Sequence, residues 1–262
     1  GLSQWSEEIG VAIAERYLET GHPKNITLTH AGPIGDWKGR GITCLGEEGL
    51  VKRWITSHMG SAFKLGKLLV DNKIEAYCLP LGVITQLWRE IAAKRPGLLT
   101  KVGLGTFVDP RVEGGKMNSV TTEEIVKVVE FEGEEWLFFK TFNIDFCLIR
   151  GTTADENGNV SLEKESMLLE GLPLAQATKN CGGKVIAQVE YLAKAGALHP
   201  KQVKIPGILV DYIVVATKPE ACWQTEGVYY NPSFSGDIKI PIDPIPELPL
   251  DRHLDLDVAL VV

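Results

Sequence analysis

Three glycine-bearing turns have residue types and spacing that are suited to binding a ligand close to the main chain. They lie at Gly32–Gly35, Leu81–Gly82 and Gly103–Gly105, and each follows a segment with strand composition. Ligands of open α/β sheets bind beyond the carboxyl ends of the strands, and glycine lets a bound molecule approach the main chain closely. The turns at 1–4 and 32–36 can also expose backbone amides to an anion or a carbonyl oxygen. Each turn alone is more typical of ordinary chain reversal, so the inference of a binding wall depends on their convergence.

Familiar phosphate-binding and nucleophile motifs are missing from the sequence. Neither GxGxxG nor GxxxxGK[ST] occurs, so a nicotinamide or nucleoside-triphosphate site is not supported. Two SxxK strings, Ser61–Lys64 and Ser161–Lys164, resemble those of serine acyl-transfer enzymes, but the companion strings SDN and KTG are absent. We expect Ser61 to cap a helix and Ser161 to lie in the strand-rich stretch, which makes both strings accidental.

Histidines and one glutamate are the remaining reactive candidates. No HxxxH or HExxH spacing occurs, so no metal site is predicted. His30 stands out because it ends a strand beside the 32–36 turn, yet a structural hydrogen bond explains it better than a chemical role. Glu156 precedes Asn157-Gly158, which we interpret as a two-residue hairpin turn with positive φ at both positions rather than as part of a nucleophile motif.

Composition narrows the class of protein. The 262 residues are 44% hydrophobic and 23% charged, which is ordinary for a globular chain, and the net charge of −7 favours neither a nucleic-acid nor an anionic-membrane partner. The five cysteines are odd in number and form no CxxC pair, so we expect reduced thiols. No apolar run reaches the ~18 residues of a membrane span, and no cationic leader precedes the first segment. The expected compartment is the cytoplasm.

Alternating helices and strands must position the turns. A helix is expected from Glu7, because apolar residues recur at helical spacing from Ile9 to Tyr17 and Gly21 ends the pattern. A helix of an α/β sheet normally follows a strand, so we expect the native protein to begin upstream of Gly1. Four segments have strand composition: 25–31, 74–80, 184–192 and 209–216. We therefore predict a three-layer α/β fold with a mostly parallel sheet.

Two regions depart from this alternation. Residues 125–163 have strand composition throughout, with turns at EGEE and DENGN, and we expect an antiparallel, strand-rich insertion there. Four prolines lie within 241–249, so residues 236–262 are expected to run extended as a linker or strap. The final stretch, 254–262, has strand composition. We therefore assign residues 1–235 to one domain and the remainder to a connection toward a second half.

Six strings carry a family resemblance when they are taken in order. They are HAGPIGDWKGRGI, NKIEAYCLPLGVI, KRPGLLTKVGLGTFVDPRVEGGKMN, RGTTADENGNVSLEKE, NCGGKVIAQVE and IPGILVDYIVVA. Together they resemble the first, α-type half of family I coenzyme A-transferases, especially the single-chain acyl-CoA:acetate or short-chain acyl-CoA transferases. The resemblance covers residues 1 to 250 and is far more specific than a lone glycine motif.

The resemblance implies a fold, an activity and a division of roles. Enzymes of this family are built from two related α/β halves, and the second half supplies a glutamate that attacks the acyl-CoA, giving an anhydride and then a glutamyl-CoA thioester. Coenzyme A is then a substrate, and no tightly bound cofactor is implied. The catalytic glutamate would lie outside this chain, so we expect the chain alone to be inactive. Its partners would be the second, β-type half, in cis or in trans, within a homo-oligomer.

The family motifs also indicate which residues contact substrate or CoA. Ten residues lie at these motif positions: Gly1, Leu2, Ser3, Gln4, Leu81, Gly82, Gly103, Gly105, Thr106 and Phe107. The first four match the end of the family's glycine-rich turn after its first strand, and the last four lie in a loop at the cleft, near the acyl or pantetheine end. Arg111 and Lys116 either face CoA phosphates or hold this loop through Asp109 and Glu113, and we favour the second interpretation.

Two departures from the family pattern leave a rival function open. Relatives carry glutamine in a Pro-Gln-Gly string where this chain has Pro80-Leu81-Gly82, which removes an amide able to orient a carboxylate or thioester. The closing RHLDLDVALVV also differs from the helix that opens the family's second half. The leading hypothesis is transfer of CoA between a short-chain acyl-CoA and a free carboxylic acid. The rival is a non-catalytic module on the same fold that senses a CoA ester or a sugar phosphate.

Overall fold

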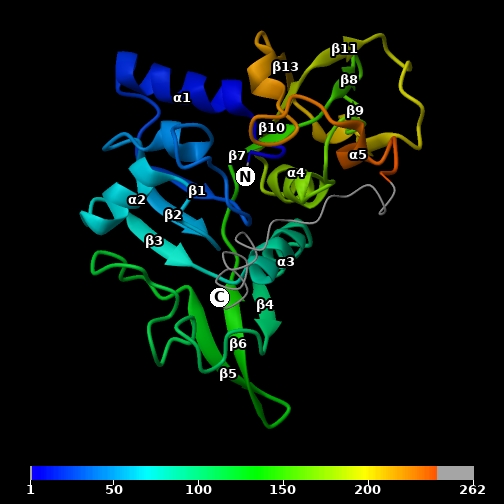
Figure 1. Ribbon diagram of the computed structural model, residues 1–262. Helices are drawn as coiled ribbons and strands as arrows, with labels where there is room; N and C mark the ends of the chain where they lie inside the picture. The colour runs from blue at the N-terminus through cyan, green and yellow to red at the C-terminus, as the bar shows by residue number, and fades with distance from the viewer. Residues whose placement is uncertain (1, 241–262) are drawn as a thin grey trace, which may run out of the picture.

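The computed structural model describes residues 2–240 and shows an α/β fold assembled from four small sheets (Figure 1). Gly1, most of the predicted strap and the predicted strand at 254–262 lie outside the described residues. The predicted α/β class is confirmed, with parallel and antiparallel sheets in the same chain. Most of the parallel strands are divided between two three-stranded sheets rather than joined in one, and one further parallel pair lies in a mixed sheet.

The first parallel sheet contains β1 (Ile26–Thr29), β2 (Val51–Thr56) and β3 (Glu75–Cys78), in that order. Its central strand carries Trp54, which is fully buried and belongs to an apolar cluster with Trp5 from the start of the chain. Because all three strands are parallel, the turns that follow them emerge at one edge of the sheet. This edge is where the sequence predicts a ligand.

The second parallel sheet has the order β13 (Tyr212–Val215), β10 (Lys184–Val189) and β7 (Phe146–Arg150). The sequence predicts β7 as part of an antiparallel insertion, and that prediction is wrong, because β7 pairs parallel to β10. The chain passes from β7 to β10 through helix α4 (Gly171–Asn180), and a helical crossover returns a strand in the same direction. The strand predicted at 184–192 is interrupted after Val189.

The remaining helices connect the strands and cover them. Their bounds are Glu7–Thr20 for α1, Phe63–Val70 for α2, Leu81–Ala92 for α3 and Pro232–Ser235 for α5, with single 3-10 turns at Ile42–Leu45 (η1), Gly207–Leu209 (η2) and Pro219–Cys222 (η3). Helix α1 ends as predicted, because Gly21 adopts φ +69° and its N–H donates to the Tyr17 carbonyl at 2.7 Å. The N-cap position of α2 is Ala62, so the predicted capping role of Ser61 is wrong. Within residues 2–240, none of the helices combines the length and apolarity that crossing a bilayer requires.

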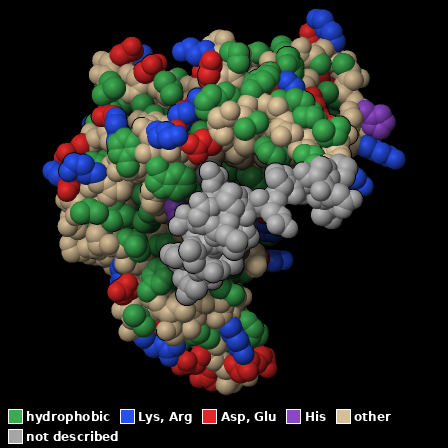
Figure 2. Space-filling model, in the orientation of Figure 1, with side chains coloured by type: hydrophobic (Ala, Val, Ile, Leu, Met, Phe, Trp, Pro, Cys, Tyr) green, Lys and Arg blue, Asp and Glu red, His purple; other side chains and the backbone are tan. Residues whose placement is uncertain are grey.

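An antiparallel sheet lies below the first parallel sheet in Figure 1 and has the order β4 (Gly97–Thr100), β6 (Glu134–Lys140) and β5 (Val126–Phe131). The two-residue loop Glu132–Gly133 has φ values of +53° and +76°, which is the turn that suits the twist of a hairpin. Figure 2 shows acidic and basic side chains gathered at the lower tip of the molecule, where Figure 1 places this hairpin. The predicted turn at EGEE is confirmed.

A mixed sheet completes the fold. Its strands run in the order β11 (Tyr191–Ala193), β8 (Thr153–Asp155), β9 (Val160–Ser161) and β12 (Val203–Ile205). The loop between β8 and β9 has four residues, and in it only Gly158 has a positive φ, so the predicted two-residue turn is wrong. The reason is Asp155, whose Oδ1 accepts the amides of Asn157 and Asn159 at 3.0 Å each and stabilises the longer loop.

Candidate functional site

Hydrogen bonds join the turns at the carboxyl edge of the first parallel sheet. Beyond β1, the Ala31 carbonyl accepts a hydrogen bond from the Ser57 hydroxyl, which lies beyond β2. Beyond β3, the Leu79 amide donates to the carbonyl of Thr56, the last residue of β2, at 2.9 Å. The glycine-bearing turns at 32–35 and 81–82 therefore emerge at the same edge, as the parallel topology requires.

The loop over residues 100–118 is attached to the free side of β3. The Cys78 amide donates to the Gly115 carbonyl at 2.8 Å, and the Gly115 amide donates to the Phe107 carbonyl at 3.0 Å. Gly115 has φ +74°, and a Cβ there would lie 2.9 Å from Leu79 Cδ2, so this contact requires glycine. The loop also contributes Val108 to the apolar core that contains Leu79. The predicted turn at 103–105 is thus held beside β3, the strand that leads to the predicted turn at 81–82.

Asp109 organises this loop from inside. Its carboxylate is 1% exposed and accepts the Gly105 amide at 2.9 Å, while the Arg111 guanidinium binds it through Nε at 3.0 Å and Nη2 at 2.7 Å. The hydrogen bonds from Arg111 and Gly105 hold the pKa of Asp109 well below its usual range. The structure agrees with the interpretation of Arg111 as a loop-holding residue. Lys116 pairs with Glu124 instead of the predicted Glu113.

His30 has a structural role at the end of β1. Its Nε2 accepts a hydrogen bond from Trp54 Nε1 at 2.8 Å, so the ring proton lies on Nδ1, which donates to the Gly32 carbonyl at 2.6 Å. Burial lowers the pKa of His30 to about 4, which keeps the ring neutral at pH 7. The predicted structural hydrogen bond is confirmed, and it fixes the start of the 32–36 turn.

The turn at residues 2–5 lies at the carboxyl end of the other parallel sheet. Leu2 is 3% exposed and Gln4 has φ +57°, an uncommon conformation for a residue other than glycine. Arg150, the last residue of β7, donates from Nη1 to the Trp5 carbonyl at 3.2 Å and reaches the Leu2 carbonyl at 3.5 Å. Within residues 2–240, no hydrogen bond or ion pair joins this turn directly to 81–82 or 103–107.

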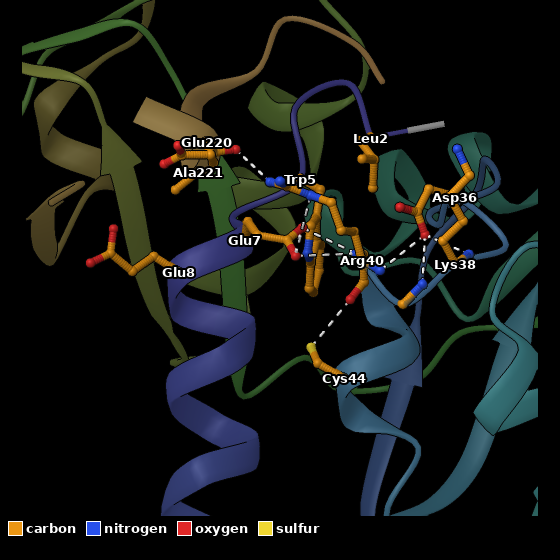
Figure 3. Close-up of polar contacts among 12 residues, drawn as sticks. Leu2, Trp5, Glu7, Glu8, Asp36, Lys38, Arg40, Cys44, Glu220 and Ala221 are labelled. Atoms are coloured by element: carbon orange, nitrogen blue, oxygen red, sulfur yellow. Dashed lines mark hydrogen bonds and ion pairs between the residues drawn. The ribbon is translucent and has the colours of Figure 1, made fainter. Parts of the chain in front are cut away.

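Helix α1 links this turn to the turn after β1, as Figure 3 shows. Glu7 extends from the first turn of α1, accepts the Gly41 amide at 3.1 Å and lies 3.9 Å from Arg40 Nε. Burial raises the pKa of Glu7. Asp36 accepts the amides of Lys38, Gly39 and Arg40, and although burial opposes ionisation, these bonds lower the pKa of Asp36.

Two hollows on the surface of residues 2–240 have no lining residue among the ten predicted site residues. The larger, of about 580 Å³, is formed by the end of the 100–118 loop and the chain up to Thr122. The smaller, of about 300 Å³, lies between Arg53, Glu123 and the end of β6. Leu81 and Phe107 are 49% and 42% exposed on the surface. The shared pocket between the glycine-bearing turns stays a prediction.

Sequence reasoning missed the buried polar residues of the second sheet. Gln188 is 0% exposed within β10, and its Oε1 accepts the Glu8 amide at 3.0 Å while its Nε2 donates to the Ala221 carbonyl at 3.0 Å. Arg150 is 4% exposed at the end of β7. The available signal was a polar or charged side chain inside or directly after a continuous apolar run, because such a group must find partners when it is buried.

Comparisons with known proteins agree on one family. The family model described as Coenzyme A transferase matches residues 7–216. A caffeate CoA-transferase of Acetobacterium woodii is 60% identical over 97% of this chain and 48% of its own length. The crystal structure of the acyl-CoA transferase YdiF apoenzyme from Escherichia coli O157:H7 matches with a TM-score of 0.90 and 41% identity, over 99% of this chain and 49% of that one. Its thioester complex with CoA matches with a TM-score of 0.87 and 41% identity, over 92% of this chain and 47% of that one. The chain spans about half the length of the curated relatives it matches.

Proposed function

Since this chain belongs to the coenzyme A transferase family, we propose that it is the first half of an enzyme that transfers CoA between an acyl-CoA and a free carboxylic acid. The second half, joined in cis or in trans within a homo-oligomer, supplies the glutamate nucleophile. The observation that carries this proposal is the family match over residues 7–216, together with identities of 60% and 41% to two transferases.

The arrangement of the turns supports a role for this chain as one wall of the site. Hydrogen bonds hold the turns at 32–35 and 81–82 at the carboxyl edge of the first sheet, and the 100–118 loop is fixed beside them. We propose that Gly103, Gly105, Thr106 and Phe107 approach the acyl or pantetheine end of the thioester. Gly105 supports this proposal, because even a Cβ there would meet no atom within 4 Å and its main chain is therefore open to a bound molecule. The turn at residues 1–4 is proposed to contact CoA as well.

The acid that accepts CoA is proposed to be caffeate or a short acid such as acetate. Caffeate is included because the caffeate CoA-transferase is 60% identical to this chain. A hydrophobic Leu81 at the position of the family's glutamine is compatible with a larger, less polar acid, since it offers apolar contact in place of an amide. Both acids are therefore tested side by side.

The test uses the complete protein with both halves. Incubation with acetyl-CoA and labelled acetate is expected to exchange label, and addition of caffeate is expected to yield caffeoyl-CoA. Hydroxylamine or borohydride is expected to trap a glutamyl thioester after incubation with acyl-CoA alone. Absence of exchange with either acid, together with absence of a trapped thioester, would refute the proposal.

The rival function is a binding module that senses a CoA ester or a sugar phosphate. Its motivation is Leu81, which lacks the amide that relatives present there. Isothermal titration of this chain by itself separates the two functions. A self-sufficient sensor binds its ligand as the isolated chain, whereas half of a cleft binds poorly until the second half is added.

A further inference from the structure

Arg150 and Glu165 form a buried ion pair outside the predicted contact residues. Their side chains are 3% and 6% exposed, and the guanidinium binds the carboxylate in a bidentate manner, from Nε at 3.0 Å and from Nη2 at 2.7 Å. Taking two charges out of water costs free energy that the pair recovers only with good geometry, and apolar replacements are often equally stable. Stability of the fold is therefore a weak explanation for this pair.

The rest of the guanidinium acts on the turn at residues 2–5. Nη1 is directed to the carbonyls of Trp5, at 3.2 Å, and Leu2, at 3.5 Å, which are the two ends of that turn. The planar fork of arginine can bind a carboxylate with one side and carbonyl oxygens with the other, which a single ammonium group cannot do. Arg150 thus fixes the turn to the end of β7.

The middle of the same turn has unused donors. Among residues 2–240, the amides of Ser3 and Gln4 have no hydrogen-bond partner, and Gln4 is held at φ +57°. Ser3 and Gln4 are partly exposed, so these two adjacent amides are open to an acceptor from a ligand, as in other anion-binding turns. The strained conformation of Gln4 persists because its surroundings impose it, and the carbonyls held by Arg150 lie on both sides of it.

We propose that Arg150 is a positioning residue that holds the 2–5 turn with the Ser3 and Gln4 amides presented to coenzyme A. This inference rests on the proposed function. Arg150 itself does not touch the substrate, and Glu165 serves to orient its guanidinium. The turn then contributes to binding of the CoA ester rather than to the reaction of the acyl group, so its loss raises KM for the CoA ester and leaves kcat nearly unchanged.

Two variants of the complete enzyme test this role. Arg150→Lys keeps a positive charge opposite Glu165 but loses the fork. The double variant Arg150→Met/Glu165→Met removes both charges, so no unpaired charge is buried and the variant is expected to fold. Arg95→Lys is the matched control, because Arg95 is an exposed arginine that binds Glu90 with two contacts of 3.1 Å.

Steady-state exchange kinetics and thermal unfolding give the result. Both Arg150 variants are expected to raise KM for acetyl-CoA about tenfold, the effect of losing one charge-assisted hydrogen bond. Their kcat and KM for the free acid are expected to stay within about twofold of the wild type, and Arg95→Lys is expected to change nothing. If the double variant does not fold, Arg150→Lys decides the question.

Failure of the proposed function and failure of the positioning role of Arg150 give different results. A wild-type enzyme without exchange activity refutes the proposed function, whatever the variants do. An active wild type with variants that fold and keep KM for acetyl-CoA within about twofold refutes the positioning role alone. A fall in kcat without a change in KM also refutes it, because the turn would then act on the reaction and not on binding.

Discussion

Replacement of His30 by glutamine tests the hydrogen-bonded end of β1. In the folded protein the ring is 6% exposed, and burial lowers its pKa from 6.5 to about 4. Above pH 6.5 the ring is neutral in both states. Between pH 6.5 and pH 4 the unfolded chain takes up a proton that the folded protein does not, so stability falls as the pH falls. Below pH 4 both states are protonated and the loss stops.

The size of this loss follows from the difference between the two pKa values. Each pKa unit corresponds to about 1.36 kcal/mol, so lowering the pKa from 6.5 to about 4 removes about 3 kcal/mol of stability across this pH range. The variant His30→Gln has no titrating side chain at this position, so its stability lacks this pH-dependent contribution. The free energy of unfolding of the wild type minus that of the variant is therefore expected to shrink by about 3 kcal/mol between pH 7 and pH 4.

Urea unfolding of the complete protein, followed by tryptophan fluorescence at a series of pH values, measures this difference. Contributions from other titrating groups cancel, because both proteins share them. His199→Gln removes an exposed imidazole and serves as the matched control. A difference between wild type and His30→Gln that stays constant from pH 7 to pH 4 would show that the buried ring is not the cause of the pH dependence.

Asp109→Asn weakens the charge-assisted bonds that hold the 100–118 loop, so a loss of about 1–3 kcal/mol is expected in thermal unfolding; an unchanged Tm would contradict the loop-holding role. Gly115→Ala places a Cβ 2.9 Å from Leu79 at φ +74° and is expected to cost about 1–3 kcal/mol. By contrast, Gly66→Ala meets no atom within 4 Å in helix α2 and is expected to stabilise by about 0.5–1 kcal/mol; equal effects of the two changes would refute the steric argument. Leu81→Gln, at a 49% exposed position, is expected to shift stability by less than about 0.5 kcal/mol and to lower KM for acetate in the exchange assay. An unchanged KM would show that this position does not select the acid.

Local signals predicted the elements that neighbouring residues determine. The end of α1 at Gly21 and the hairpin at Glu132–Gly133 both depend on backbone conformations that a few adjacent residues decide. The direction of β7 depends instead on α4, which begins 21 residues after β7 ends. The composition of residues 125–163 carries no information about that connection. A prediction from composition alone therefore favoured antiparallel pairing.

The same limit applies to the candidate site. The glycine-bearing turns were visible because turn chemistry is local, and their shared edge followed from the parallel pairing of β1, β2 and β3. The partners of Arg150 lie up to 148 residues away along the chain. No spacing rule connects residues so distant, and only the folded chain shows that β7 ends beside residues 2–5.

The start of α1 is bonded to the second parallel sheet through Gln188 and, through Glu7, to the Gly41 amide in the connection between β1 and β2 of the first. Helix α1 therefore connects the two parts of the molecule that contain the parallel sheets. A hinge motion that closed the two sheets around a substrate would have to rotate α1 and carry residues 2–5 with it. Deuterium uptake at the Glu8 amide during turnover would consequently report whether the chain works as one stiff body or flexes at this joint.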